Sequence, residues 1–341
     1  RNFAGSHFLE DVYTYNDFIH NGKTVPLDRP EQIARARAPY LVTEHNGHMF
    51  PTKKFDNEEK RVEHALRHLR VLDAMYGSER ISGAVGWCMS DYNTHKDFGS
   101  GDLICHHGVT DMFRLPKYAA AAYRSQQDDD VVMEVASGMH QGERAASLIE
   151  SVHIFTNCDS VRLYKDGTYI GTYLPDKAAF PNLPHPPVVI RDFIGGLLVK
   201  NEGLSERDAE RVKRIFAAVI RYGDRSLPLR YKLIMGYILL KYRYSYQDAA
   251  NLFMKYVAGW GSESAEFLFE GYIGEEPAAT ARRGMTHITE LKVSAQTLTL
   301  AERDTYDVCR VTLEHTDQYG AVMPYSNEAV RVTVSGAGER I

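Results

Sequence analysis

The sequence lacks several features that mark well-known classes of protein. Its four cysteines, Cys88, Cys105, Cys158 and Cys309, are scattered and include no Cys-x-x-Cys pair, so they predict neither a disulfide framework nor a zinc ribbon. Cysteines used in this way favour a cytoplasmic location. The sequence also has no run of about 18 apolar residues, so it predicts no membrane span.

The sequence also lacks a large excess or a long run of charges of one sign. The formal net charge is −5 and no basic run occurs, which argues against a nucleic-acid partner. The 341 residues are enough for roughly two or three domains, each with its own core. Because the sequence begins at Arg1 without a signal-like segment and ends just after a strand-like run, we expect a fragment of a longer protein.

The first part of the chain alternates between strand-like and helix-like segments. Residues 8 to 15, 40 to 42 and 81 to 87 are predicted strands, while residues 56 to 76 and 111 to 127 are predicted helices. This alternation is typical of a βα repeat with a parallel sheet. About three strands are visible, whereas a closed (β/α)8 TIM barrel needs eight, so residues 1 to 127 are predicted to be part of such a barrel.

The pattern of apolar residues changes after the charged break at residues 128 to 130. Short strands of period two follow, and Lys165-Asp166-Gly167 predicts a hairpin turn between two of them. We therefore expect residues 128 to 284 to form a β-sandwich. A helical insertion is predicted at about residues 189 to 260, where Ser205 and Ser245 each open a helix with an Asp three residues later.

The last part of the sequence again predicts strands. Residues 291 to 293, 309 to 315 and 330 to 334 have strand character, and residues 317 to 320 predict a turn. Short strands at about ten-residue spacing favour an immunoglobulin-like sandwich. Residues 285 to 341 are therefore predicted to be an incomplete immunoglobulin-like domain.

Polar residues of the kinds that bind sugars follow two successive predicted strands. Glu44 ends the first strand and Asn46 follows it, while Trp87 and Asp91 follow the second. Carboxyl ends of parallel strands are where barrel enzymes place their catalytic groups. On its own, Glu44 could be an incidental acid on a surface turn. Two such strand ends in succession favour a sugar-binding pocket in which Trp87 faces the ring. Hydroxyls could be bonded by Asp91, Asn93, His45 and His48, and Asn46 is a further candidate for substrate binding.

A retaining glycosidase needs a second carboxylate about 5–5.5 Å from its nucleophile to act as acid and then base. Glu10, Asp11 and Asp91 are the nearby carboxylates, and none carries a signature of that role. The sequence pattern therefore leaves the second carboxylate unidentified.

Three stretches of the first part carry a resemblance to a known family. They are LVTEHNGHMFPTK, ISGAVGWCMSDYNTHKDFGSGD and ICHHGVTDMFRLPKYAAAAYRSQQ, in this order along the chain. Together they resemble the C-terminal part of the catalytic barrel of glycoside hydrolase family 2, the β-galactosidase and β-glucuronidase family. The following residues resemble, less sharply, the β-sandwich domains that come after that barrel, and DTYDVCRVTLEHTDQYG is similar to an immunoglobulin-like domain found there.

The resemblance implies roles for individual residues. Glu44 matches the family's nucleophile at the end of the seventh barrel strand, and Trp87 matches a tryptophan that lines the sugar subsite. His48 lies near a family histidine that contacts sugar hydroxyls. His107 lies where some β-galactosidases place a polar sugar or cation contact, although its residue type differs from theirs.

The family's acid/base is a glutamate in an Asn-Glu pair at the end of the fourth strand. The Asn-Glu pairs of this sequence lie elsewhere, at residues 57–58, 201–202 and 327–328. We therefore expect an upstream glutamate to supply the acid/base, and this chain alone to be inactive. The whole protein is predicted to be a retaining β-glycosidase, and a β-galactosidase in preference to a glucuronidase because no lysine-rich motif lies near Glu44.

Other interpretations remain open beside this one. The alternative function is a non-catalytic carbohydrate-binding or scaffold module. A supporting Mg²⁺ or Na⁺ ion and a homo-oligomeric state are also open. His64 and His68 have the spacing of a zinc-protease helix, but Ala65 replaces the required glutamate, so we expect a solvated helix face. Cys105-His106-His107 could ligate a metal, yet no second cluster completes four ligands.

Overall fold

The structure is a computed structural model of the chain. The described residues are 11–34, 38–46, 50–96, 101–140, 149–257, 265–336 and 338. The chain divides into two compact units, Arg1–Met285 and Thr286–Ile341. Each unit is described by itself below.

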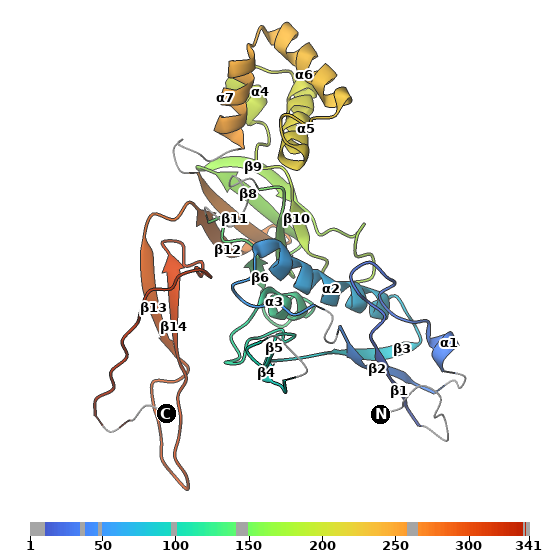
Figure 1. Ribbon diagram of the computed structural model, residues 1–341, viewed down its shortest axis with the longest axis vertical. Coiled ribbons are helices and arrows are strands. Elements are labelled where there is room, and N and C mark those ends of the chain that lie inside the picture. Colours follow the sequence, from blue (N-terminus) through green and yellow to red (C-terminus); the bar gives the residue numbers. More distant parts are fainter. Residues whose placement is uncertain are drawn as a thin grey trace. The chain divides into compact units, whose positions relative to one another are not determined.

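A three-stranded parallel sheet opens the first unit. Its order is β1 (Tyr13–Asp17), β2 (Tyr40–His45) and β3 (Ile81–Gly86), with a short helix α1 (Pro30–Ile33) between β1 and β2. The predicted strands are thereby confirmed in place, although the first begins later than predicted. Helix α2 (Glu58–Tyr76) connects β2 to β3 and lies along the sheet (Figure 1). Val71 of this helix packs in one buried cluster with Tyr13, Tyr40 and Val42 of the sheet.

The sequence of α2 explains both its start and the face that it buries. Asn57 caps the helix, because its side chain accepts a hydrogen bond from the Lys60 amide at 2.8 Å. Val62, Ala65, Leu69 and Leu72 then recur at helical spacing and are buried. The predicted helix over residues 56 to 76 is confirmed.

The predicted helix over residues 111 to 127 is wrong at its start. Helix α3 spans only Tyr118–Arg124. The Asp111 carboxylate accepts hydrogen bonds from the amides of Phe113 and Leu115, both at 2.9 Å, and so stabilises a turn in place of a helix. Pro116 has no amide hydrogen and could not have joined a helical ladder there.

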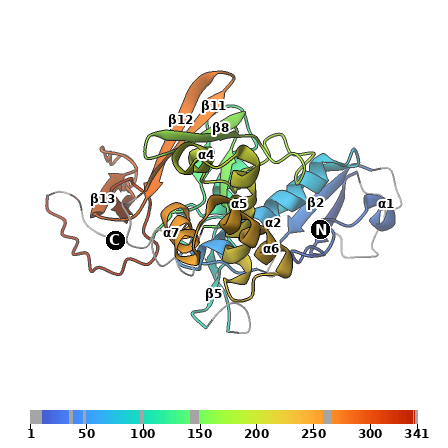
Figure 2. The same ribbon diagram turned by 90° about the horizontal axis from the view of Figure 1, so that it is seen from above.

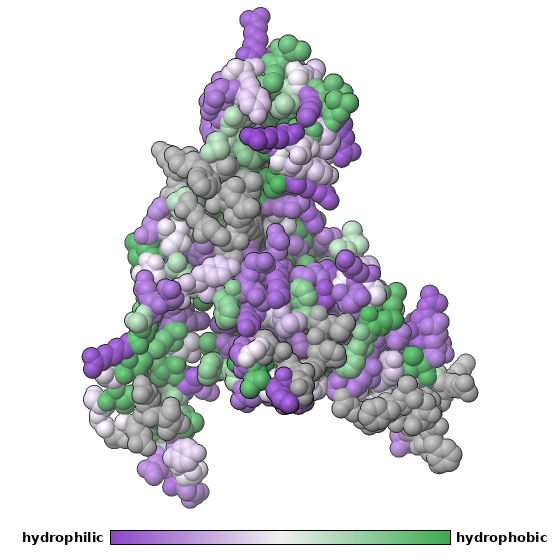
Figure 3. All heavy atoms as spheres, viewed as in Figure 1, coloured by the Kyte–Doolittle hydropathy of each residue, from purple (hydrophilic) through white to green (hydrophobic). Residues whose placement is uncertain are grey.

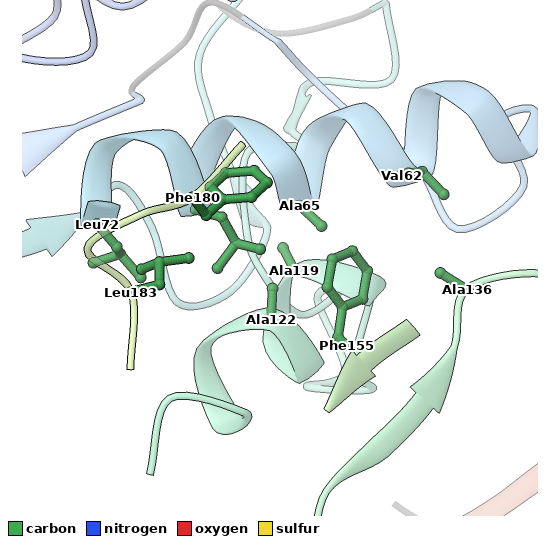
Figure 4. Close-up of a cluster of buried hydrophobic side chains, with 10 residues drawn as sticks. Val62, Ala65, Leu72, Ala119, Ala122, Ala136, Phe155, Phe180 and Leu183 are labelled. Atoms are coloured by element: carbon green, nitrogen blue, oxygen red, sulfur yellow. The ribbon is translucent and has the colours of Figure 1, made fainter. Parts of the chain in front are cut away.

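Helices α2 and α3 share one core with the strands that follow them. Ala65 of α2 and Ala119 of α3 face Phe155 and Phe180, which come from beyond residue 127 (Figure 4). Phe155 is fully buried in this cluster. The predicted domain boundary between residues 127 and 128 stays a prediction, and a continuous cluster of buried side chains spans it.

Two antiparallel sheets follow in the same unit. One has the order β10 (Val188–Ile190), β7 (Val152–Thr156), β6 (Met133–Val135), and the other the order β12 (Glu276–Gly284), β11 (Glu266–Ile273), β8 (Ser160–Lys165), β9 (Thr168–Tyr173). Their shared core includes Val135, Ile154, Leu163, Ile190 and Phe269.

The hairpin predicted between β8 and β9 is confirmed. Asp166 and Gly167 have φ angles of 48° and 72°, as the two central residues of a tight hairpin turn require. Strand β12 was not predicted, because as an exposed edge strand it lacks the alternation of apolar residues that marks a half-buried strand.

Between β10 and β11, the described residues form four helices. They are α4 (Leu197–Glu202), α5 (Glu206–Tyr222), α6 (Leu229–Tyr242) and α7 (Tyr246–Tyr256), and Figure 2 looks down on them. Leu198, Val212, Phe216 and Ile238 form their buried core. Helix α7 begins with the predicted capping box, in which Ser245 and Asp248 satisfy each other's backbone amides.

The outer surface of this helical region carries apolar side chains. Leu229, Leu233 and Leu240 of α6 are exposed, and Figure 3 shows hydrophobic patches over these helices. Even so, no helix among the described residues is long and apolar enough to cross a membrane.

The second unit contains one antiparallel pair in its described residues, β13 (Thr289–Ala295) and β14 (Val311–Asp317). The predicted turn after β14 is confirmed, since the Gly320 amide donates to the Asp317 carbonyl at 2.9 Å. The predicted strand at residues 330 to 334 is wrong. Its alternating valines have strand propensity, but they are exposed and pair with no neighbouring strand.

Candidate functional site

The parallel sheet brings the two predicted strand ends together. Glu44 and His45 end β2, and Gly86 ends β3 directly before Trp87. His45 pairs with Gly86 in the register of the two strands, and the Trp87 amide donates to the His45 carbonyl at 2.9 Å. Glu44 and Trp87 therefore lie at the same carboxyl-terminal edge of the sheet, as the sequence predicted.

Strand β1 supports Glu44 from the other side. Asn16 pairs with Glu44 in the parallel register of β1 and β2. The Thr43 hydroxyl donates to the Asn16 side-chain oxygen at 2.8 Å, which fixes the strand just before Glu44. Asn16 was not singled out from the sequence, because the register that brings it to Glu44 is a property of the sheet.

Trp87 is partly buried and is held by a second aromatic ring. Tyr92 lies in β4 (Tyr92–Asn93), which pairs with β5 (Ile104–Cys105). The rings of Trp87 and Tyr92 are 6.0 Å apart and meet edge to face at 82°. The peptide bond between Trp87 and Cys88 is cis. Tyr92 therefore restricts the indole from one side.

Asp91 lies in a buried ion pair. One of its carboxylate oxygens accepts from the Lys117 ammonium at 2.7 Å and from the Gly108 amide at 2.8 Å. The side chains of Lys117 and Asp91 are only 4% and 3% exposed. Lys117 also donates to the Thr52 carbonyl at 2.7 Å, so the pair joins the loop after β3 to the loop after β2.

Burial lowers the pKa of Lys117, and the hydrogen bond and charge of Asp91 act in the opposite direction. Lys117 was missed in the sequence because a single lysine before a helix carries no pattern. These contacts account for the burial of Asp91 without a ligand, and its predicted contact with a sugar hydroxyl stays a prediction.

The side chains of Cys105, His106 and His107 do not form a metal site with other described residues. His107 is buried and its Nδ1 lies 2.9 Å from the Cys105 sulfur, while His106 contacts Asp91 and Asp102. Within the described ranges, no three His, Cys, Asp or Glu side chains are arranged to hold a metal ion. The predicted sugar or cation contact of His107 stays a prediction.

Asn46 follows β2 and is unusual in its bonding. Its φ angle is 60°, and both of its side-chain amide atoms are buried without a hydrogen-bond partner among the described residues. A buried amide without partners costs free energy that a bound hydroxyl group could offset. This agrees with the predicted role of Asn46 in substrate binding, which is still untested. His48, the other candidate in this turn, lies outside the described residues.

The expectation of a solvated face for His64 and His68 is wrong. The two residues are 3% and 1% exposed, and their rings lie 5.0 Å apart inside the protein. The His68 ring lies 5.7 Å from that of His45, and the Tyr123 hydroxyl lies 3.0 Å from His68 Nδ1 and 3.4 Å from His45 Nε2. His20 is also buried and faces this cluster.

Burial is the dominant electrostatic influence on these histidines. It lowers the pKa of His45 and of His64 to about 3, and it also lowers the pKa values of His20 and His68. The rings are therefore uncharged at neutral pH. A signal for their burial was present in the sequence, because His64 and His68 directly precede Ala65 and Leu69, which lie on the apolar face of the helix.

Among the described residues, no glutamate of an Asn-Glu pair lies at the sheet edge. The carboxylate that ends β1, Asp17, is buried and accepts hydrogen bonds from the amides of Ile19 and Asp28. Asp11 is exposed, and Glu10 lies outside the described part of the chain. Glu58 is buried at the start of α2, Glu202 bonds Lys255 and Tyr256 in the helical region, and Glu328 belongs to the second unit. None of the three Asn-Glu pairs, all of them described, lies at the end of β1, β2 or β3.

A separate hollow of about 910 Å³ lies between the helical region and the β-sheet. Its lining includes Lys165, Arg191, Phe193, Lys213 and Phe267. None of the predicted site residues lines this hollow, so it is distinct from the edge that carries Glu44 and Trp87.

Comparison with known proteins finds relatives of one kind. No protein-family model matches the sequence. The β-galactosidase of Thermoanaerobacterium thermosulfurigenes is 37% identical over 341 residues, which are 98% of this chain and 40% of that protein. The β-galactosidase of Rhizobium meliloti is 32% identical over 352 residues, which are 98% of this chain and 38% of that protein. The chain is therefore related in sequence to β-galactosidases, in agreement with the resemblance to glycoside hydrolase family 2.

Solved structures of glycosidases align with most of this chain. A β-glycosidase from Bacteroides vulgatus aligns with a TM-score of 0.55 at 12% identity, over 92% of this chain and 36% of that chain. A β-glucuronidase from glycoside hydrolase family 2 aligns with a TM-score of 0.48 at 16% identity, over 93% and 26% of the two chains. The resemblance stated from the sequence is confirmed. The chain spans about 40% of the length of the curated relatives that it matches.

Proposed function

We propose that this chain provides the nucleophile side of the active site of a retaining β-glycosidase that acts on β-galactosides. The observation that supports this most is the pairing of His45 with Gly86, which brings Glu44 and Trp87 to one edge of a parallel sheet. The names of the curated relatives, which are β-galactosidases, favour a galactoside as the substrate.

In this proposal the Glu44 carboxylate attacks the anomeric carbon and forms a covalent glycosyl-enzyme, while the leaving oxygen receives a proton from a second carboxylic acid. Water then attacks the same carbon, the second carboxylate takes its proton, and the bond to Glu44 breaks. A glutamate outside the described residues supplies that second group. The overall result is hydrolysis with retention of the β configuration.

Trp87 and Asn46 would bind the sugar. The indole face of Trp87 packs against the C–H face of the ring, and Tyr92 keeps the indole in that orientation. The amide of Asn46 would pair with a hydroxyl, which satisfies the buried atoms that have no partner among the described residues. Asp91, His48 and His107 remain further candidates for hydroxyl contacts.

Several finer predictions belong to the same proposal. Residues 1 to 127 form the last strands and helices of a (β/α)8 barrel, residues 128 to 284 form a β-sandwich with inserted helices, and residues 285 to 341 are part of an immunoglobulin-like domain. The proposed protein is cytoplasmic. The proposal also allows for a homo-oligomer and for a Mg²⁺ or Na⁺ ion that supports the site.

Mechanism-based labelling tests the proposed function. The protein, extended to the length of its β-galactosidase relatives, is treated with a 2-deoxy-2-fluoro-β-galactosyl reagent. It is then digested, and the masses of its peptides are measured by mass spectrometry. We expect a glycosyl mass increment on the peptide that contains Glu44, and none in a Glu44→Gln variant. A Glu59→Gln variant, which changes an exposed carboxylate on α2, should be labelled normally.

An unlabelled but folded protein would contradict the proposal, provided that the same reagent inactivates a known β-galactosidase. If the unlabelled protein still binds galactosides, the alternative of a non-catalytic carbohydrate-binding module is favoured. A label on a different carboxylate would remove Glu44 from the role of nucleophile.

A further inference from the structure

One hydroxyl group connects three elements beneath the proposed nucleophile. Tyr123 lies on α3, and its oxygen is 3.0 Å from Nδ1 of His68 on α2 and 3.4 Å from Nε2 of His45 on β2. The tyrosine and histidine rings meet edge to face, with the centroids of His68 and Tyr123 5.4 Å apart. Helices α3 and α2 and strand β2 therefore meet at this oxygen.

The sequence leaves room for this hydroxyl at one particular position. A Cβ atom on Gly86 would lie 2.5 Å from the Tyr123 oxygen, 3.3 Å from His68 Nδ1 and 3.4 Å from His45 Cε1. A contact of 2.5 Å with an oxygen is well inside van der Waals distance, so only a glycine fits here without movement. Gly86 is also the residue directly before Trp87 and the partner of His45 in the sheet.

The protonation of the two histidines suits this bridge. Burial lowers the pKa of His45 to about 3 and that of His68 well below its usual value, so both rings are neutral at pH 7. A neutral imidazole has one N–H donor and one bare nitrogen acceptor. The tyrosine hydroxyl can therefore donate to one ring and accept from the N–H of the other.

These contacts reach the two proposed site residues through the backbone. His45 follows Glu44 in the chain, and its carbonyl accepts the hydrogen bond from the Trp87 amide at 2.9 Å. The ring of His45 is held by Tyr123, and the backbone of Gly86 lies against the same hydroxyl. A shift of that hydroxyl would move Glu44 and Trp87 relative to each other.

We propose that Tyr123 is a positioning residue that fixes the nucleophile Glu44 relative to Trp87, acting through His45 and the space left by Gly86. This rests on the proposed function, since it assigns Glu44 and Trp87 to one sugar site. Tyr123 itself touches neither the substrate nor the reacting atoms.

The test uses three variants of the protein extended to the length of its relatives. Tyr123→Phe removes the hydroxyl alone, Gly86→Ala adds the clashing Cβ, and the double variant combines both. Misplacing a reacting group by about 1 Å costs on the order of 100-fold in rate. We expect kcat to fall about 10-fold in Tyr123→Phe and about 100-fold in Gly86→Ala, with KM changed less than about 3-fold in each.

The double variant gives the decisive comparison. Without the hydroxyl, the nearest of the remaining contacts of the new Cβ are His68 Nδ1 at 3.3 Å and His45 Cε1 at 3.4 Å, which need a shift of only a few tenths of an ångström. We therefore expect the double variant to recover to the kcat of Tyr123→Phe. Recovery by removal of an oxygen is an outcome that a general loss of stability would not produce. This comparison holds even if Gly86→Ala alone fails to fold.

Matched controls come from the same elements. Tyr118→Phe makes the same chemical change on α3, at a hydroxyl that contacts Arg61, and Gly83→Ala adds a Cβ on β3 that meets only the flexible Leu41 side chain at 3.2 Å. Both should retain kcat within about 3-fold, and thermal unfolding checks that every variant is folded.

Two results would overturn the proposal. One is a Tyr123→Phe protein with the kcat of the parent, and the other is a double variant no more active than Gly86→Ala or, if that variant does not fold, well below Tyr123→Phe. Failure of the proposed function is separate, because it appears as undiminished activity in Glu44→Gln, whatever the Tyr123 variants do.

Discussion

Acid should destabilise the first unit through its buried histidines. His45 and His64 have pKa values lowered to about 3 in the folded protein, whereas a histidine in an unfolded chain has a pKa of about 6.5. Between these values the unfolded chain binds protons that the folded chain does not. Stability contributed by the neutral rings is therefore complete above pH 6.5 and is lost as the pH falls toward 3.

The size of the effect follows from these pKa values. A pH of 5 lies about 1.5 units below the pKa of a histidine in the unfolded chain, and each unit stabilises the protonated unfolded chain by about 1.4 kcal/mol. Each ring then costs about 2 kcal/mol, and His45 and His64 together cost about 4 kcal/mol. His20 and His68 act in the same direction. The pKa of His64 is lowered mainly by burial, and the positive charges of Lys117 and Arg67 contribute to that lowering.

Urea unfolding at pH 7.5 and pH 5, followed by circular dichroism, measures this loss directly. The His64→Gln variant removes one buried titrating ring, so its loss of stability between the two pH values should be smaller by about 2 kcal/mol than that of the parent. His287→Gln changes an exposed histidine of the second unit and should behave as the parent. An equal pH dependence in His64→Gln and the parent would refute the reasoning.

Two further predictions concern stability alone. Lys117→Met leaves the Asp91 carboxylate buried without its ion-pair partner, and should lower the free energy of unfolding by about 3–5 kcal/mol in urea titrations at pH 7.5, whereas Lys232→Met on the exposed face of α6 should change it by less than about 0.5 kcal/mol. Ser245→Ala removes the capping box of α7 and should cost about 1 kcal/mol, measured as faster hydrogen exchange in the first turn of that helix; unchanged exchange there would contradict the assigned cap.

The sequence predicted the site edge because its signals are local there. A short apolar strand followed by Glu44, and another followed by Trp87, are each visible within about ten residues, and parallel pairing is what a βα repeat implies. The positions of Lys117 and Tyr123 depend on which helix face and which loop meet these strands, and that information is distributed over the whole chain. The missing zinc-protease glutamate gave no information on whether His64 and His68 are buried, whereas their position directly before the buried Ala65 and Leu69 did.

Some secondary-structure predictions were wrong because the structure of a segment depends on what it packs against or pairs with. The valines of residues 330 to 334 have strand propensity, but a strand forms only when another strand satisfies its backbone. The helix predicted from residue 111 begins only at Tyr118, because Asp111 stabilises a turn and Pro116 cannot donate a backbone hydrogen bond. The edge strand β12 gave no apolar pattern because one of its faces meets solvent.

Replacement of the nucleophile gives the most direct test of the central claim. In a Glu44→Ala variant of the protein at the length of its relatives, 2,4-dinitrophenyl β-galactoside is supplied together with sodium azide. If Glu44 is the nucleophile, azide occupies the vacated space, attacks the anomeric carbon on the face opposite the leaving group, and restores turnover with an α-galactosyl azide as product. A β-galactosyl azide would assign Glu44 to the acid/base role, and turnover equal to that of the parent without azide would contradict a catalytic role for Glu44.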